Sequence, residues 1–80
     1  MNRQEIEEKL KDIITDKLGW DQSEIFHNSD LTEDLGADSL DKIELMVIAE
    51  TAFGITIPDD DAERVVTFKQ LVDLVEKEIK

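Results

Sequence analysis

The sequence lacks cysteine and is poor in residues that break regular structure: it has no cysteine, one proline and three glycines among 80 residues. Disulfides therefore cannot supplement the thin core of so short a chain, and a reducing compartment fits this composition. No apolar run approaches the roughly 18 residues of a membrane span, and the charged N-terminal stretch holds no apolar signal segment. We expect residues 1–80 to form one soluble, cytoplasmic, monomeric domain.

Positive charge is almost absent from the middle of the chain. Residues 21–63 contain thirteen acids and one base, Lys42, and so hold the whole net charge of −12. Such a surface repels phosphate, which excludes nucleic acid as a partner. Disorder is the alternative interpretation of so acidic a chain. Because 40% of the residues are hydrophobic and they recur periodically, we predict instead a folded domain whose acidic middle meets basic partners.

Hydrophobic spacing and capping residues predict an all-α fold, a small four-helix bundle. The first helix begins near Asn2 and stops at Gly19, and a long loop, residues 20–37, follows it. The second helix spans residues 39–53, with Asp38 as its N-cap and Gly54 as the residue that breaks it, and residues 59–65 form a short third helix. A capping box of Thr67 and Gln70 opens the last helix.

The second helix has two apolar faces, as positions spaced at ~100° per residue show. One is a predicted core-facing stripe with Met46 at its edge: Leu45, Ile48, Ala49, Ala52 and Phe53. The other is a small exposed patch rimmed with negative charge: Leu40, Ile43 and Val47. The buried side of the last helix should contain Phe68, Leu71, Val72, Val75 and Ile79. We expect four residues to pin the long loop: Ile25, Phe26, Leu31 and Leu35.

Catalysis finds little support in the residues around Ser39. A serine nucleophile needs an adjacent base, and the only histidine, His27, is interpreted as a solvated loop residue. Asp38 and Asp41 have a reference pKa of about 3.9 and would be feeble bases. We therefore predict that the chain is not an enzyme.

Two other chemistries remain for the acidic middle. Acids between Asp30 and Asp41 partly match a calcium-loop template, but Leu35 stands where the template requires glycine, so we expect only weak, general association with divalent cations. Ser39 could instead bear a phosphoester, because the first turn of a helix favours negative charge. Alternatively, Ser39 is an ordinary helix-start residue.

The residues around Ser39 resemble the modification motif of acyl carrier proteins. The motif here reads Gly36-Ala37-Asp38-Ser39-Leu40-Asp41, followed by Ile43-Glu44-Leu45. The similarity covers nearly the whole chain and includes Leu35, Phe53, Ile57-Pro58-Asp59 and Thr67. It implies that a phosphopantetheinyl transferase attaches 4′-phosphopantetheine from coenzyme A to Ser39. The thiol of that arm would then carry acyl groups as thioesters.

The resemblance also implies two sets of further site residues. A docking face would meet basic patches on acyl-transfer and synthase enzymes, and it comprises Asp38, Leu40, Asp41, Ile43, Glu44, Val47, Glu50, Asp59, Asp60 and Glu63. An acyl-chain cavity would be lined by Leu45, Met46, Ile57, Val65, Leu71 and Leu74. For the second set, plain core packing is the alternative.

The pathway stays open at this point. Lys42 stands where fatty-acid carriers more often have a small or uncharged residue, so polyketide or specialised lipid synthesis is an alternative to fatty acid biosynthesis. The competing function from another class is an acidic protein-interaction or divalent-cation-binding helical module without a prosthetic group.

Overall fold

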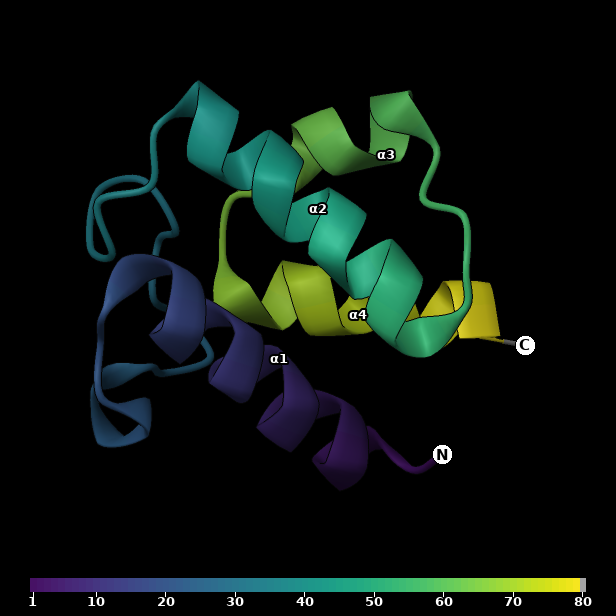
Figure 1. Cartoon of the computed structure of the whole chain (residues 1–80), viewed down its shortest axis with the longest axis horizontal. Helices are drawn as coiled ribbons and strands as arrows, with labels where there is room; N and C mark the ends of the chain where they lie inside the picture. Colours follow the sequence, from purple (N-terminus) through teal and green to yellow (C-terminus); the bar gives the residue numbers. More distant parts are fainter. Residues whose placement is uncertain (80) are drawn as a thin grey trace.

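The computed structural model describes residues 1–79, and it is built from helices joined by loops (Figure 1). The three long helices and the short one are α1 (Arg3–Leu18), α2 (Ser39–Phe53), α3 (Asp59–Arg64) and α4 (Phe68–Ile79). A single 3₁₀ turn, η1 (Gln22–Glu24), interrupts the long loop after α1. Residues 1–79 contain no strand, only one isolated bridge between Asp30 and Thr67. The predicted all-α fold with a short third helix is confirmed.

The helix ends lie where the capping residues predicted them. Asn2 and Glu5 form a reciprocal capping box at the start of α1, and the Glu5 N–H donates to Asn2 Oδ1 at 2.9 Å. Gly19 and Gly54 end α1 and α2 in the left-handed conformation, with φ of 80° and 65°. Only glycine takes that conformation without strain, so these two residues fix where the long helices stop.

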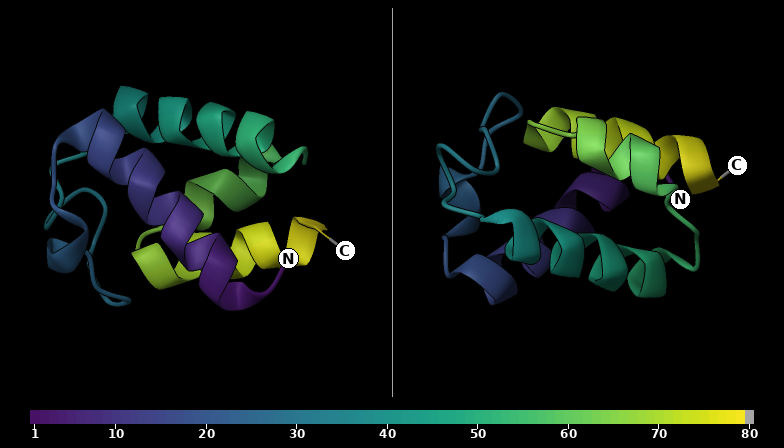
Figure 2. Two further views of the ribbon diagram at one scale, coloured as in Figure 1. Left: turned by 60° about the horizontal axis from the view of Figure 1, so that its bottom comes forward. Right: turned by 90° about the horizontal axis from the view of Figure 1, so that it is seen from above.

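The core lies where α1, α2 and α4 pack against one another (Figures 1 and 2). Phe68 is its largest fully buried side chain, and Ile6, Leu10 and Ile14 form the contribution of α1. α2 contributes Leu45, Met46 and Ala49. α3 contributes no buried residue and is anchored by the buried residues that flank it, Ile57 and Val65.

Two predicted core positions on α2 are corrected by the structure. Ile48 was expected in the buried stripe, but it is 40% exposed, whereas Met46, expected at the edge, is buried. α2 packs against both α1 and α4, so its buried side is centred on Leu45, Met46 and Ala49 and leaves Ile48 outside.

Phe26 was expected to pin the loop, but it is 61% exposed. The backbone is extended at Ile25, so successive side chains point to opposite sides. Ile25 takes the buried side, and Phe26 therefore faces outward. Leu31 and Leu35 are buried as predicted, while Ile79 in the last turn of α4 is only partly buried.

The long loop completes the N-terminus of α4 through its backbone. The N–H groups of Phe68 and Lys69 donate to the carbonyls of Ser29 and His27, both at 2.9 Å. The first N–H groups of a helix have no partner within the helix, so the loop satisfies donors that would otherwise be buried without acceptors. The two ends of the same loop are joined by Trp20, whose indole N–H donates to the Leu35 carbonyl at 2.8 Å.

Arg3 joins the start of α1 to α4. Its guanidinium contacts Asp73 at 2.7 Å and Glu76 at 3.0 Å. The hydrogen bond from Arg3 is the main reason why the pKa of Asp73 is lowered, with a further contribution from Lys69.

No helix within residues 1–79 is long and apolar enough to cross a bilayer.

The Arg3–Asp73 contact predicts acid-dependent stability. Because the pKa of Asp73 is lower in the folded than in the unfolded chain, its contribution is present above the unfolded pKa of about 3.9 and is lost as the pH falls through the folded value. We expect Asp73→Asn to lower the free energy of unfolding at pH 7 by at most about 1 kcal/mol, since the pair is partly exposed.

Urea unfolding at about pH 7 and at about pH 3 measures this contribution. The difference between wild type and Asp73→Asn should shrink at the lower pH. Asp16→Asn is the matched control, because Asp16 is an exposed acid on α1 and its removal only reduces the net negative charge. A pH-independent loss in Asp73→Asn, or an equal loss in Asp16→Asn, would contradict the assignment.

Candidate functional site

Ser39 is the first residue of α2, and its side chain is exposed. It does not cap the helix. The cap is Asp38, whose Oδ1 accepts from the Asp41 N–H at 2.8 Å, while Asp41 Oδ2 accepts from the Asp38 N–H at 3.2 Å. Because the two aspartates form the capping box, the Ser39 hydroxyl is not needed to start the helix.

The other two serines have structural roles. Ser29 is buried, and its Oγ accepts from the Phe26 N–H at 2.9 Å. The Ser23 hydroxyl donates to Asp21, the N-cap of η1, at 3.2 Å. Ser39 is therefore the serine best placed for a reagent that approaches from solvent.

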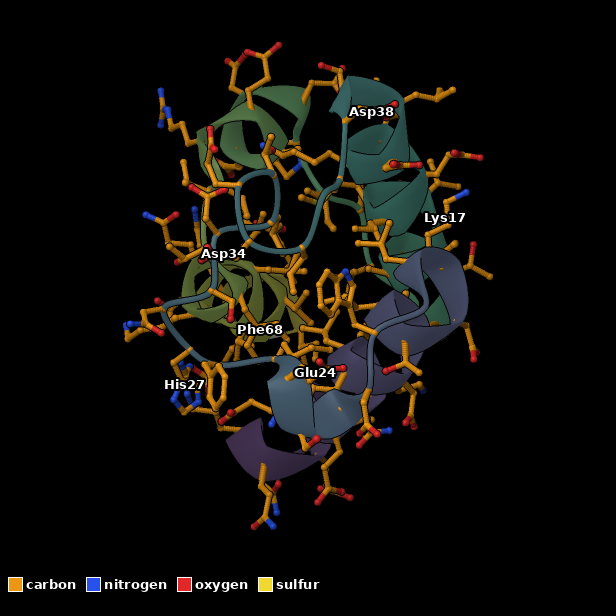
Figure 3. The ribbon with its side chains drawn as sticks, turned by 90° about the vertical axis from the view of Figure 1, so that its left-hand side faces the viewer. Lys17, Glu24, His27, Asp34, Asp38 and Phe68 are labelled. Carbon is orange, nitrogen blue, oxygen red and sulfur yellow. The ribbon has the colours of Figure 1, made fainter. Side chains whose placement is uncertain are left out.

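His27 lies far from the start of α2, as the separation of His27 and Asp38 in Figure 3 shows. Its ring stacks on Phe68, with 6.4 Å between the ring centroids, and its Nε2 contacts the Glu7 carboxylate. The histidine is exposed, as predicted, and it belongs to the contact between the loop, α1 and α4. It is not placed to activate Ser39.

The exposed apolar patch on α2 is present as the spacing predicted. Leu40, Ile43 and Val47 are 63%, 61% and 54% exposed. Three predicted docking acids, Asp59, Asp60 and Glu63, are exposed on the neighbouring α3. The exposed apolar patch of α2 therefore lies beside an acidic surface on α3.

The four remaining docking acids all have partners within the chain. Asp38 and Asp41 form the cap described above, and Glu44 pairs with Lys17 of α1 at 2.9 Å. The hydrogen bond to Glu44 is the main reason why the pKa of Lys17 is raised, and the charges of Asp41 and Asp38 act in the same direction. Glu50 accepts from the Ile57 N–H at 2.8 Å and holds the segment after α2.

A pocket of about 540 Å³ opens between α2 and α3 beside Ser39. Its lining combines apolar and charged side chains: Ser39, Lys42, Ile43, Met46, Val47, Glu50, Ile57, Asp59, Ala62 and Glu63. Of the six residues predicted to line an acyl cavity, Met46 and Ile57 line this pocket. The other four, Leu45, Val65, Leu71 and Leu74, are buried in the core, and Val65 and Leu74 also border a smaller hollow beside α4.

The sequence singled out Lys42 as the one base of the acidic middle and as a departure from the usual pattern of fatty-acid carriers, but it assigned the side chain no contact. In the structure its Nζ donates to the Val65 carbonyl at 2.6 Å, at the end of α3. Lys9 makes the equivalent contact at the end of α2. Its Nζ donates to the Ala52 carbonyl at 2.9 Å and lies 5.1 Å from the centroid of the Phe53 ring. Helical spacing carries no signal for either contact, because both join residues distant in sequence.

Comparison with known proteins identifies the family. A family model described as a phosphopantetheine attachment site matches residues 8–75. An acyl carrier protein of Guillardia theta is 46% identical over 79 residues, which cover 99% of this chain and 98% of that protein. The chain belongs to the acyl carrier protein family.

Two further comparisons support the same family assignment. An acyl carrier protein of Rubrobacter xylanophilus is 47% identical over 75 residues, covering 94% of this chain and 93% of that protein. A solved structure from Mycobacterium tuberculosis, provisionally named an acyl carrier protein, superposes with a TM-score of 0.85 at 32% identity and covers 90% of this chain and 96% of the other.

Membership confirms the carrier role and the prosthetic group predicted from the motif. Acyl carrier proteins carry covalently attached 4′-phosphopantetheine, and they are carriers, not enzymes. Their partners are a transferase together with acyl-transfer and synthase enzymes. These findings favour the carrier over the acidic module without a prosthetic group.

The acids of α3 and of the start of α2 predict that cations stabilise the folded protein. The exposed acids of α3 and the start of α2 repel one another, and millimolar Mg²⁺ or Ca²⁺ relieves this repulsion. We expect the melting temperature to rise by about 4 °C or more in calorimetry at low ionic strength, and to rise less in KCl of equal ionic strength. A melting temperature that is indifferent to both salts would contradict the prediction.

Proposed function

We propose that Ser39 bears the 4′-phosphopantetheine arm and that the chain, as a single carrier unit, supplies acyl groups for fatty acid biosynthesis or a related lipid or polyketide pathway. The observation that carries this proposal is an exposed serine, outside the helix cap, at the rim of a partly apolar pocket. When bound, the group supplies a terminal thiol that holds acyl chains as thioesters. The residues around Ser39 fit such an arm because they leave the hydroxyl open to solvent.

The start of α2 favours a phosphoester electrostatically. The first turn of a helix carries partial positive charge and free N–H groups, which stabilise a phosphate on Ser39. Asp38 and Asp41 oppose the negative charge at close range, so an attached arm is directed away from the capping box. Since the described residues give the Ser39 hydroxyl no base, the transferase has to accept its proton.

Partner enzymes are proposed to dock on the exposed patch of α2 and the acids of α3. Leu40, Ile43 and Val47 offer apolar area to a partner, while Asp59, Asp60 and Glu63 attract a basic rim around it. The acids of α2 act differently, because Glu44 is already paired with Lys17 and Glu50 is bound to backbone. We expect them to contribute less to attraction than their formal charge suggests.

The cargo is proposed to lie between α2 and α3. Five apolar side chains line this pocket next to Ser39: Ile43, Met46, Val47, Ile57 and Ala62. They offer an acyl chain an apolar environment without any change in the core. Leu45, Val65, Leu71 and Leu74 stay predicted contacts for a longer chain that would have to part α2 from α4.

The attachment site is tested by intact-mass measurement. The protein is incubated with coenzyme A and a broad-specificity phosphopantetheinyl transferase. We expect wild type to gain the mass of one phosphopantetheine and Ser39→Ala to gain none. Ser23→Ala is the matched control, because it removes another exposed serine hydroxyl from the chain and should be modified like wild type.

Circular dichroism of each variant verifies that it is folded. Folded wild type that gains no mass would refute the attachment proposal. Modification of folded Ser39→Ala would show that another residue bears the arm.

The docking face is tested by Leu40→Ser. Leu40 is 63% exposed and does not line the pocket, so its loss should weaken docking without changing the cargo site. We expect the transferase kcat/KM for the variant to fall on the order of tenfold, a typical cost for an apolar interface residue. Ile48→Ser is the matched control, because Ile48 is an exposed aliphatic residue of α2 outside the patch. Equal effects of the two substitutions would count against the proposed face.

A further inference from the structure

α3 is the least firmly held helix of the structure. It has six residues, none of them buried, and Pro58 provides no side-chain cap at its start. A helix this short has almost no stability of its own in water, so contacts with the rest of the molecule must hold it. Figure 1 shows α3 above α4, and the right-hand view of Figure 2 shows it in front of α4 and to one side of α2.

Few side-chain contacts hold α3 in place. Asp61 lies 3.7 Å from Lys77 of α4, but the lysine side chain is 69% exposed, and such ion pairs contribute little. The contact with α2 is stronger. Lys42 Nζ donates to the Val65 carbonyl at 2.6 Å in a partly buried setting.

The Lys42 contact lies at the C-terminal end of α3, where backbone carbonyls lack partners within the helix. Val65 is the C-cap of α3, and the last carbonyls of a helix lack partners within the helix and carry partial negative charge. An ammonium group there supplies both a hydrogen bond and a favourable charge, and charge-assisted hydrogen bonds are the stronger kind.

The same lysine spans the pocket between the two helices. Lys42 lines the pocket from α2, and α3 with its flanking residue Ile57 forms the opposite wall. Moving α3 away from α2 would enlarge the pocket and would require this hydrogen bond to break. Ser39 lies one turn before Lys42 and lines the same pocket, so the contact is next to the proposed attachment residue.

We propose that Lys42 is a strap that ties the end of α3 to α2 and thereby sets how readily the pocket opens to an apolar chain. The strap itself is a property of the unmodified chain. Only its consequence for an acyl chain rests on the proposed function.

Amide hydrogen exchange of the unmodified protein tests the strap without any prosthetic group. In Lys42→Met, which keeps the apolar stem and removes the ammonium, we expect the hydrogen-bonded amides of residues 62–65 to exchange on the order of tenfold faster. Amides of α1, α2 and α4 should change less than about twofold. Lys42→Arg, which keeps a charged donor, should restore most of the protection.

Lys69→Met is the matched control, because it removes one exposed lysine that pairs only with Asp73 on its own helix. It should leave exchange in residues 62–65 unchanged. The Lys42→Met comparison is repeated in about 0.5 M NaCl, where general repulsion among the surface acids is screened. Unchanged exchange of α3 in Lys42→Met, or a difference that vanishes in salt, would overturn the strap.

The consequence for cargo is measured on protein loaded with acetyl or octanoyl pantetheine arms. Octanoyl should raise the melting temperature more than acetyl in wild type, and the gain should be larger in Lys42→Met, where the pocket opens at lower cost. An equal gain in both proteins would refute the gating role even if the exchange result holds. Failure to load Ser39 would refute the proposed function and leave the exchange result to decide the strap.

Discussion

The register of α2 is the constraint on which the site depends. The capping box of Asp38 and Asp41 fixes the residue at which the helix begins, and every later position follows at a fixed angle. Ser39 then stands at the exposed first position, Leu40 and Ile43 face outward, Met46 faces the core and Lys42 points to the end of α3. A start one residue later would rotate the whole set by about 100° and bury the wrong face.

Several of the nine basic residues link one helix to another. Lys9 and Lys42 each bond a carbonyl at the end of a neighbouring helix, and Lys17 and Arg3 bond carboxylates across α1 and its neighbours. In a chain with a net charge of −12, these contacts link the helices to one another, while the outer acids of α3 remain exposed. Basic residues thus join the helices, while exposed acids form the outer surface of α3.

Local signals predicted the helices well, since caps and glycines act over three or four residues. Asn2, Gly19, Asp38 and Gly54 set helix boundaries in the structure, and Thr67 with Gln70 forms the expected box at α4. Periodicity was less reliable for α2. That helix packs on two neighbours, so a single stripe could not show that Met46 is buried and Ile48 exposed.

The candidate site also has some features that local sequence signals predicted and others that they could not predict. The exposure of the apolar patch followed from the helical spacing of α2 alone. The pairing of Glu44 with Lys17, the bond from Ile57 to Glu50 and the pocket between α2 and α3 depend on how distant segments meet. Spacing along one helix carries no information about such contacts.

The way in which the long loop meets α4 has an evolutionary consequence. The acceptors for the first N–H groups of α4 are the backbone carbonyls of His27 and Ser29. Every residue type offers that carbonyl, so the contact itself does not demand a histidine at position 27. The loop can therefore accumulate substitutions on its exposed side chains and diversify the outer surface of the carrier, while the helix that it caps keeps the same start.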